Sequence, residues 1–306
     1  MALIRELGKQ SIPCIVIGKK YIQTSRYASV SLKTKSNDDL LRILLLLPQL
    51  IKIPLVLLTD DDRYLQLLES NWEQLILHYK IPASLENKQL TDKTTLAKIK
   101  NQTRVILPKT FKNYKEIPEN GYPIIIKPLI QQSLASHLNI QPKKAYICCS
   151  KEEVLKTIKI LNKLKFPFLI QELIQGSAAK IYNVLLYRNS NGRIIVGFVS
   201  KKLRSFPIGF GTGAAQITEK NDMLIEESIK LMEQTSYVGA AEFEYKFCNQ
   251  KKIFYLIEVN GRFPLQCSLL HKTNPSFISI IFQDLIKPSK AYNQTLFTEN
   301  IVWIYF

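Results

Sequence analysis

The strongest chemical signal in the sequence is a run of alternating polar residues, Glu258-Val259-Asn260-Gly261-Arg262. If this run is a β-strand, Glu258, Asn260 and Arg262 project from one face, about 7 Å apart. Carboxylate and amide oxygens are ligands that Mg²⁺ prefers, and a bound Mg²⁺ keeps phosphate oxygens in its shell. Arg262 adds a forked donor for a phosphoryl oxygen. The pattern therefore predicts a magnesium site that faces a phosphate group.

A second carboxylate comes from a neighbouring predicted strand. Ala240–Phe247 and Ile253–Asn260 are separated by a short polar turn and predict a hairpin, which brings Glu244 beside Glu258. Glu242 shares the face of Glu244 and is the alternative ligand. A solvated outer face would explain Glu244 alone, but Glu258 has apolar neighbours on both sides. A buried carboxylate needs a partner, so the pattern favours a site.

Two further strands carry weaker signals. Tyr122–Lys127 is an apolar predicted strand that ends in a lysine and is followed by Pro128. An ammonium group there is costly unless it meets an anion, for which a nucleotide phosphate is suited; a lysine that reaches solvent is the alternative. The predicted strand Phe166–Leu173 runs on into Ile174, and its backbone could offer N–H and C=O groups to an adenine edge.

The remaining pattern divides the chain into two regions. Within the first 88 residues, predicted helices over 2–10 and 40–47 alternate with apolar strands over 12–17 and 53–58, which indicates a small parallel α/β domain. Residues 89–306 contain antiparallel hairpins and predict an α+β domain. Its other predicted elements are strands over Val105–Leu107, Tyr146–Cys149, Ile181–Tyr187, Ile194–Lys201 and Ile301–Phe306, and helices over Lys151–Leu164, Asp222–Thr235 and Pro275–Leu285.

Cysteine usage and hydropathy bear on the compartment. The five cysteines form no CxxC pair and the three histidines are isolated, which argues against a zinc site or a disulfide framework and fits a reducing compartment. The start of the chain carries the charges of Arg5 and Glu6 where a signal peptide needs an apolar core, and the apolar run Leu40–Leu47 is too short to span a bilayer. We expect a cytoplasmic protein without membrane contact.

The net charge is strongly positive. Lys and Arg number 42 against 25 Asp and Glu, which gives +17. The basic residues come as pairs, such as Lys143-Lys144 and Lys201-Lys202, rather than as long blocks. We interpret the excess as solvated lysines together with an anionic nucleotide ligand; a nucleic-acid-binding protein is the alternative.

In order and spacing, these motifs resemble the ATP-grasp superfamily, in particular its carbamoyl-phosphate-synthetase-like and uncharacterised bacterial carboxylate ligases. The resemblance implies a small Rossmann-like pre-ATP-grasp α/β domain over 1–88. A two-lobed ATP-grasp domain would follow, with lobe A over about 89–170 and lobe B over about 171–306. The matching pieces span about residues 91–285 and are Asp92-Lys93, Lys127, Gln171–Ile174, Glu244 and Glu258-x-Asn260-x-Arg262.

The resemblance also implies a reaction: MgATP activates a small-molecule carboxylate as an acyl phosphate, which is then coupled to an amine or another nucleophile. Such phosphoryl transfer depends on positioning and charge neutralisation. The ion would be Mg²⁺ or Mn²⁺, and a homodimer is the default assembly. By this resemblance Lys93 and Lys127 hold the phosphates, Gln171, Glu172, Leu173 and Ile174 the adenine, Glu244, Glu258 and Asn260 the metal, and Arg262, Lys202 and Arg204 the transferring phosphoryl group.

Some positions depart from the family pattern. The loop after Lys127 has no glycine up to Gln141, so Ser133, Ser136 and His137 would supply its donors. The acid expected for the ribose falls on Ala179 or Lys180, and the first strand of the small domain is missing. These departures favour an alternative, a degenerate or truncated ATP-binding module without catalysis. Less specific candidates are Asp60–Asp62, as a helix cap or substrate contact, the loop Gly209–Gly213, and Gln266, Cys267, Ser268 and His271 near the predicted site.

Overall fold

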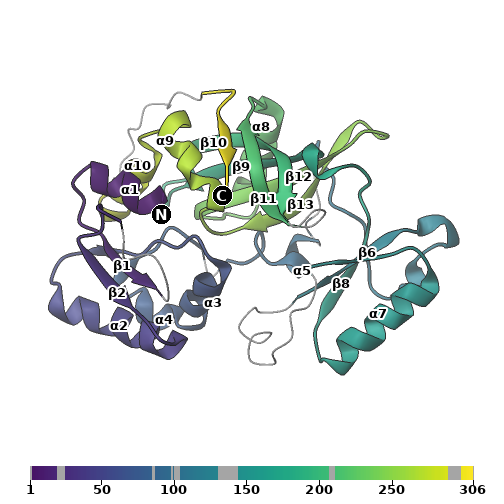
Figure 1. The fold of residues 1–306 in the computed structure, drawn as a ribbon, viewed down its shortest axis with the longest axis horizontal. Helices are drawn as coiled ribbons and strands as arrows, with labels where there is room; N and C mark the ends of the chain where they lie inside the picture. The colour runs from purple at the N-terminus through teal and green to yellow at the C-terminus, as the bar shows by residue number, and fades with distance from the viewer. Residues whose placement is uncertain are drawn as a thin grey trace.

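The protein, in a computed structural model, consists of three structural regions arranged along its long axis (Figure 1). An N-terminal region with helices α2 and α3 lies at one end, and a four-stranded sheet with α7 lies at the other end. A six-stranded sheet lies between them. The structure describes residues 2–18, 25–84, 87–97, 99, 104–129, 144–206, 211–288 and 298–305.

The N-terminal region contains two pairs of parallel strands, β1 with β2 and β3 with β4, as the alternating pattern predicts. The predicted strand over 53–58 is wrong in extent, because only Leu55–Val56 pair. Pro54 precedes them and lacks a backbone N–H, and Ile53 is 69% exposed. The elements are α1 (Ala2–Lys9), β1 (Ile15–Gly18), β2 (Val30–Lys33), α2 (Asn37–Leu50), β3 (Leu55–Val56), α3 (Asp62–Ser70), α4 (Trp72–Leu75) and β4 (Tyr79–Lys80).

Helix α2 begins and ends differently from the prediction. Ser36 is its N-cap, whose hydroxyl accepts from the Asp39 N–H at 3.1 Å, whereas Asp39 accepts from the Lys35 N–H at 3.0 Å. The helix also continues past Pro48, which has no N–H to donate to the carbonyl of Leu44. The Tyr79 hydroxyl donates to that carbonyl instead, at 2.6 Å, so the helix tolerates the proline.

The four-stranded sheet is antiparallel throughout, in the order β5-β8-β6-β7. Helix α7 covers one of its faces, and Ser150 caps this helix by accepting from the Glu153 N–H. Lys127 lies on β6, opposite Leu169 of β8. The elements are α5 (Lys93–Leu96), β5 (Thr110–Phe111), β6 (Ile124–Pro128), β7 (Tyr146–Cys148), α7 (Lys151–Lys163) and β8 (Phe168–Glu172), with 3-10 turns at Tyr114–Glu116 and Glu119–Gly121.

The six-stranded sheet is also antiparallel, in the order β13-β12-β9-β10-β11-β14, and it confirms both predicted hairpins. β11 was not predicted, since its glycines suggested only a loop. The predicted strand Val105–Leu107 is wrong: a single bridge joins Ile106 to Tyr255 at the edge of β13. The strands are β9 (Ile181–Arg188), β10 (Ile194–Phe206), β11 (Thr212–Thr218), β12 (Gly239–Cys248), β13 (Ile253–Asn260) and β14 (Val302–Ile304).

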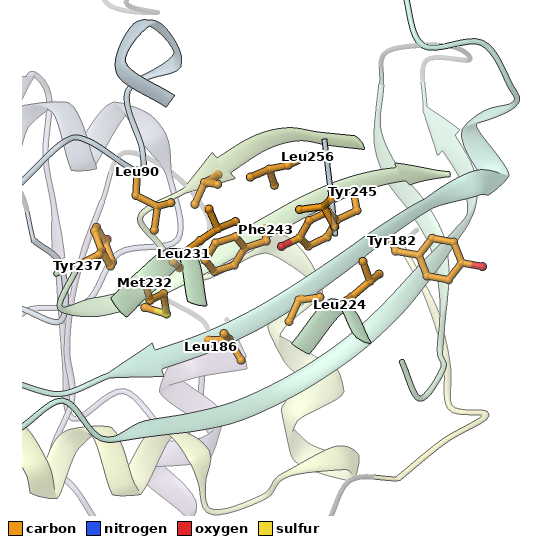
Figure 2. Close-up of a cluster of buried hydrophobic side chains, with 14 of the residues drawn as sticks. Leu90, Tyr182, Leu186, Leu224, Leu231, Met232, Tyr237, Phe243, Tyr245 and Leu256 are labelled. Atoms are coloured by element: carbon orange, nitrogen blue, oxygen red, sulfur yellow. The ribbon is translucent and has the colours of Figure 1, made fainter. Parts of the chain in front are cut away.

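The two faces of this sheet are covered unequally. Helix α8 (Asp222–Gln234) packs Leu224 and Leu231 against one face, which contributes Tyr182, Leu186 and Phe243 to a continuous apolar core (Figure 2). On the opposite face, apolar side chains of α1, α9 (Leu270–Thr273) and α10 (Phe277–Ile286) form a second core with β9 and β10. Buried polar residues continue that second face beyond this core: Asn183, Ser200, Lys202, Gln216 and Glu242.

None of the helices in the described ranges is both long and apolar enough to cross a membrane.

Candidate functional site

Two carboxylates on the polar face meet two lysines from other elements. Glu244 on β12 and Glu258 on β13 are direct partners across the strand pair, so their side chains project from the same face. The Lys93 Nζ, at the start of α5, lies 2.9 Å from the Glu258 Oε1. The Lys202 Nζ, on β10, lies 3.5 Å from the Glu244 Oε1. The predicted carboxylates therefore lie together, and each forms its own ion pair.

The charges around Glu258 fix its ionisation. Burial acts to raise the pKa of this carboxyl, but the positive charges of Lys93, Lys127 and Arg262 outweigh it and lower the pKa to about 2. In return, Glu258 raises the pKa of Lys93. Glu258 is therefore an anion throughout the physiological range, which is the state that a metal ligand requires.

Lys127 is placed differently from the other two lysines. It borders a pocket between α5, the four-stranded sheet and the edge of β13, together with Lys93, Leu107, Leu169, Leu256 and Ile257. Burial lowers the pKa of Lys127, and the nearby Lys93 adds to this. Among the described residues no carboxylate forms an ion pair with Lys127 within 4 Å. Its ammonium group is thus available for an anionic ligand in the pocket.

Arg262 is bound by a residue of the N-terminal region. Its Nε donates to the Asp62 Oδ1 at 2.5 Å and its Nη2 to the Asp62 Oδ2 at 3.0 Å, a two-pronged pairing. Burial would lower the pKa of Arg262, but these bonds to Asp62 raise it. Asp62 is the first residue of α3, whereas Asp61 is the helix cap that accepts from the Arg63 N–H. The predicted cap therefore applies to Asp61, and Asp62 joins the site.

Glu242 connects the predicted metal ligands to the arginine. The Gln266 Nε2 donates to its Oε1 at 2.7 Å, and the Asn260 Nδ2 donates to its Oε2 at 3.4 Å. The Arg262 Nη1 lies 4.0 Å from the same oxygen. Burial raises the pKa of Glu242 to about 7, although Arg262 opposes this. Because the Asn260 nitrogen is the atom that faces Glu242, the amide oxygen is not used in this bond.

The side chains of the predicted adenine strand are bonded within the protein. The Gln171 Nε2 donates to the Thr110 Oγ1 at 2.9 Å, and the Glu172 carboxylate accepts from the Lys109 N–H at 2.8 Å. Leu173 is half-buried, and Ile174 is buried in a small apolar cluster with Cys248 and Tyr255. The predicted contacts to an adenine would therefore come from the backbone of this segment rather than from the two polar side chains.

Arg204 is not brought into this group. A β-bulge at Leu203 shifts the register between Lys202 and Arg204, so Lys202 is buried while Arg204 is exposed. In the described ranges, no hydrogen bond or ion pair connects Arg204 with the carboxylates. The two residues to which the resemblance gives a common role are therefore separated at the bulge.

The less specific candidates lie in several places. His271 pairs with Glu6 of α1, at 3.2 Å, away from the carboxylates. Cys267 is 2% exposed and burial raises the pKa of its thiol, so it is not an activated nucleophile. Gln266 is buried against Glu242. Lys180 ends a 3-10 turn at Ala178–Lys180. Residues 130–143, with Ser133, Ser136 and His137, and residues 207–210 lie outside the described residues.

The donor set suits magnesium better than a soft metal. Over the described part of the chain, no three His, Cys, Asp or Glu side chains gather in a group that could hold a metal ion. The predicted set is instead two carboxylates and one amide, Glu244, Glu258 and Asn260. Hard oxygen ligands that leave coordination positions for phosphate oxygens fit Mg²⁺ or Mn²⁺.

A family model matches the part of the chain that carries much of this site. Residues 214–274 match the family described as carbamoyl-phosphate synthase L chain, ATP binding domain. The matched segment contains both strands of the β12–β13 hairpin, and with them Glu244, Glu258, Asn260 and Arg262. No curated protein matches the chain in sequence.

Comparison with solved structures extends the similarity over nearly the whole chain. Biotin carboxylase from Campylobacter jejuni, in a β-γ-ATP complex, has a TM-score of 0.73 at 15% identity over 96% of this chain and 70% of that one. N5-carboxyaminoimidazole synthetase from Staphylococcus aureus, complexed with ADP, has a TM-score of 0.69 at 15% identity over 98% and 77%. The biotin carboxylase domain dimer of 2-oxoglutarate carboxylase from Hydrogenobacter thermophilus, with MgADP and bicarbonate, has a TM-score of 0.69 at 13% identity over 96% and 69%.

These relatives are ATP-grasp proteins, so this chain has the ATP-grasp fold, and the resemblance predicted from its sequence is confirmed. Sequence reasoning did not find Asp62 as the partner of Arg262. The only signal was the acidic run Asp60–Asp62 directly after a predicted strand. Glu242 was recognised only as an alternative ligand, and its bonds to Asn260 and Gln266 were not predicted.

Proposed function

We propose that this protein is an ATP-grasp ligase that binds MgATP, activates a small-molecule carboxylate as an acyl phosphate, and couples it to an amine or another nucleophile. The observation that carries the proposal is the juxtaposition of Glu258, Glu244 and their lysines with a pocket whose wall holds Lys127, which forms no ion pair with the carboxylates that the structure describes. Negative groups for a metal and positive groups for phosphates thus lie side by side.

Each part of MgATP has matching groups. Lys93 and Lys127 would hold the phosphates, and the backbone after Glu172 would hold the adenine. Glu244, Glu258 and Asn260 would hold Mg²⁺, which neutralises phosphate charge and fixes the phosphate geometry. Because Lys93 is 40% exposed, its head can leave Glu258 for a phosphate oxygen when the metal takes the carboxylate.

The transfer step would depend on fixed positive charges. Arg262 and Lys202 lie on the same face as the carboxylates and would stabilise the transferring phosphoryl group and the acyl phosphate. Arg262 can stabilise the phosphoryl group only if the substrate replaces the Asp62 carboxylate as the partner of its guanidinium group. Arg204 is exposed beyond the bulge, and we do not include it in this step.

We further propose residues 1–88 as the pre-ATP-grasp domain, with lobes over about 89–170 and 171–306. The separate sheets of the three regions support this division. A cytoplasmic location agrees with the five unpaired cysteines. A homodimer is supported by the dimer of the 2-oxoglutarate carboxylase domain.

A second candidate function is a nucleotide-binding module without catalysis. It is favoured by one observation, the occupation of the Arg262 fork by Asp62. Such a module binds MgATP but never forms ADP and phosphate, whereas the ligase forms both once its carboxylate and nucleophile are supplied. Nucleotide binding therefore comes first in the tests, and a screen of carboxylates for ADP release comes second.

The first test is calorimetric titration with a non-hydrolysable ATP analogue, with and without Mg²⁺. The variants are Glu258→Ala and Lys127→Ala, with Lys163→Ala, on the exposed side of α7, as the matched control. We expect Mg²⁺-dependent binding by the wild type and the control, and binding at least about 100-fold weaker in both site variants, equivalent to about 2.7 kcal/mol. Absence of binding by folded wild-type protein would refute the proposal.

A further inference from the structure

The two lysine–carboxylate pairs of the site differ in how firmly the lysine is held. The Lys93 side chain is 40% exposed and belongs to the four-residue helix α5, which begins there. The Lys202 side chain is only 6% exposed and lies within the long strand β10, between two neighbouring strands. Lys93 can therefore move to a new partner at little cost, whereas Lys202 stays in place.

Besides its ion-pair partner Glu244, Lys202 interacts electrostatically with Glu242, a carboxyl group whose pKa is raised by burial. The partner of Lys202 on β11 is Gln216, whose Oε1 accepts from the Asn183 Nδ2 at 3.2 Å and from the Ser200 Oγ at 2.6 Å. These three side chains are buried and neutral. Of the carboxylates that the structure describes, Glu244 alone forms an ion pair with Lys202. A buried ammonium that lost this carboxylate would be left uncompensated, which is strongly unfavourable.

This arrangement has a consequence for metal binding. Two carboxylates that face each other across a strand pair can hold two divalent ions, as in sites where both ions clamp a transferring group. Here one of the two, Glu244, is already paired with the buried Lys202 ammonium, at 3.5 Å. A second divalent ion next to Glu244 would lie close to the Lys202 ammonium and be repelled by it in a poorly solvated site.

We propose that Lys202 takes the place of a second metal ion, so that the nucleotide site of this protein holds a single divalent cation. That ion is bound by Glu258 and Asn260, which lie on the same strand, and shares Glu244 with Lys202. The inference rests on the proposed nucleotide binding, and it assigns to Lys202 a role as a built-in counter-cation.

The test counts metal ions with Mn²⁺, whose unbound form has a characteristic electron paramagnetic resonance signal. Protein is kept in excess over a non-hydrolysable ATP analogue, and Mn²⁺ is titrated until all nucleotide is bound and beyond. We expect one tightly bound Mn²⁺ per nucleotide in the wild type and two in Lys202→Met, where Glu244 loses its cation. Lys201→Met is the matched control and should keep one, because Lys201 pairs with Glu219, at 3.4 Å, instead.

The possible outcomes separate this inference from the proposed function. Two Mn²⁺ ions per nucleotide in the wild type overturn the role of Lys202 while leaving nucleotide binding intact, and this count does not depend on any variant. A folded Lys202→Met protein that binds the nucleotide with one Mn²⁺ also overturns it. If calorimetry shows no nucleotide binding by the wild type, the proposed function fails, and the inference fails with it. Lys202→Arg, which keeps the charge, should retain a single ion.

Discussion

The α8 side and the polar side of the six-stranded sheet use buried carboxylates in opposite ways. On the α8 side, Glu227 is fully buried and accepts from the Arg104 N–H at 2.7 Å, the Arg104 Nε at 3.0 Å and the Lys230 Nζ at 3.0 Å. On the polar side, Glu258 is 34% exposed and has a single close ion-pair partner, Lys93. A carboxylate has about four acceptor positions, so Glu227 is nearly saturated and Glu258 is not.

The difference separates a structural acid from a binding one. The hydrogen bonds to Glu227 hold the segment at Arg104 against α8, and two of them come from Arg104 itself. Glu258 keeps acceptor positions for a metal, and its present partner can move away. The pKa of both carboxyl groups is lowered, although burial acts to raise it in each case. The number of bonded donors, rather than the ionisation state, therefore distinguishes the two roles.

The comparison predicts that replacing Glu258 mainly weakens nucleotide binding, whereas replacing Glu227 mainly lowers stability. Glu258→Gln should weaken Mg²⁺-dependent nucleotide binding at least about 100-fold. Its cost in unfolding free energy should be only about 1 kcal/mol, because solvent screens the half-exposed pair. Glu227→Gln should leave the nucleotide Kd unchanged and cost about 2 kcal/mol of unfolding free energy. The amide keeps one acceptor oxygen, so either the Arg104 N–H or the Arg104 Nε and Lys230 Nζ lose their acceptor. Calorimetry and urea unfolding measure both quantities. Equal losses of affinity in the two variants would contradict the distinction.

Glu242, a buried acid on the polar side, should make the unfolding free energy depend on pH, and this dependence gives a second test of the comparison. Burial raises the pKa of Glu242 from 4.5 to about 7, so the folded protein holds a proton that the unfolded chain releases at lower pH. The stability from this group is complete below about pH 4.5 and is lost as the pH rises through 7. Between pH 5 and pH 7 the loss should be about 2 kcal/mol. Glu242→Gln, which stays neutral, should remove that part of the slope in urea unfolding. Parallel slopes for variant and wild type would show that Glu242 is ionised throughout.

Much of the site could be predicted because it is local in sequence. The β12–β13 hairpin follows from two apolar runs and a polar turn, and the alternation along β13 places Glu258 and Asn260 on one face. The resemblance to the family was less informative on β10. It implied that Lys202 and Arg204 act together, but the bulge at Leu203 separates them, and nothing in the local sequence marks that bulge.

What could not be predicted depends on contacts between distant segments. β11 exists as a strand because β10 and β14 pair with it on both sides, whereas its glycine and alanine residues alone favour a loop. Asp62 and Arg262 are 200 positions apart, and their pairing depends on how the N-terminal region packs against the sheet. Periodicity describes the faces of single elements and contains no information about such packing.

The pairing of Asp62 with Arg262 gives the smallest expected effect and asks whether the N-terminal region belongs to the polar side at all. The Asp62 side chain is 44% exposed, so Asp62→Asn should cost no more than about 1 kcal/mol of unfolding free energy, and the wild-type contribution should shrink with added salt. Nucleotide affinity should not change, because the Lys93 and Lys127 positions are untouched. Urea unfolding at low and high NaCl, with calorimetry alongside, measures both. A loss of nucleotide binding in Asp62→Asn would instead mean that Asp62 holds Arg262 in the binding geometry, and that the contrast between the two sides of the sheet extends into the N-terminal region.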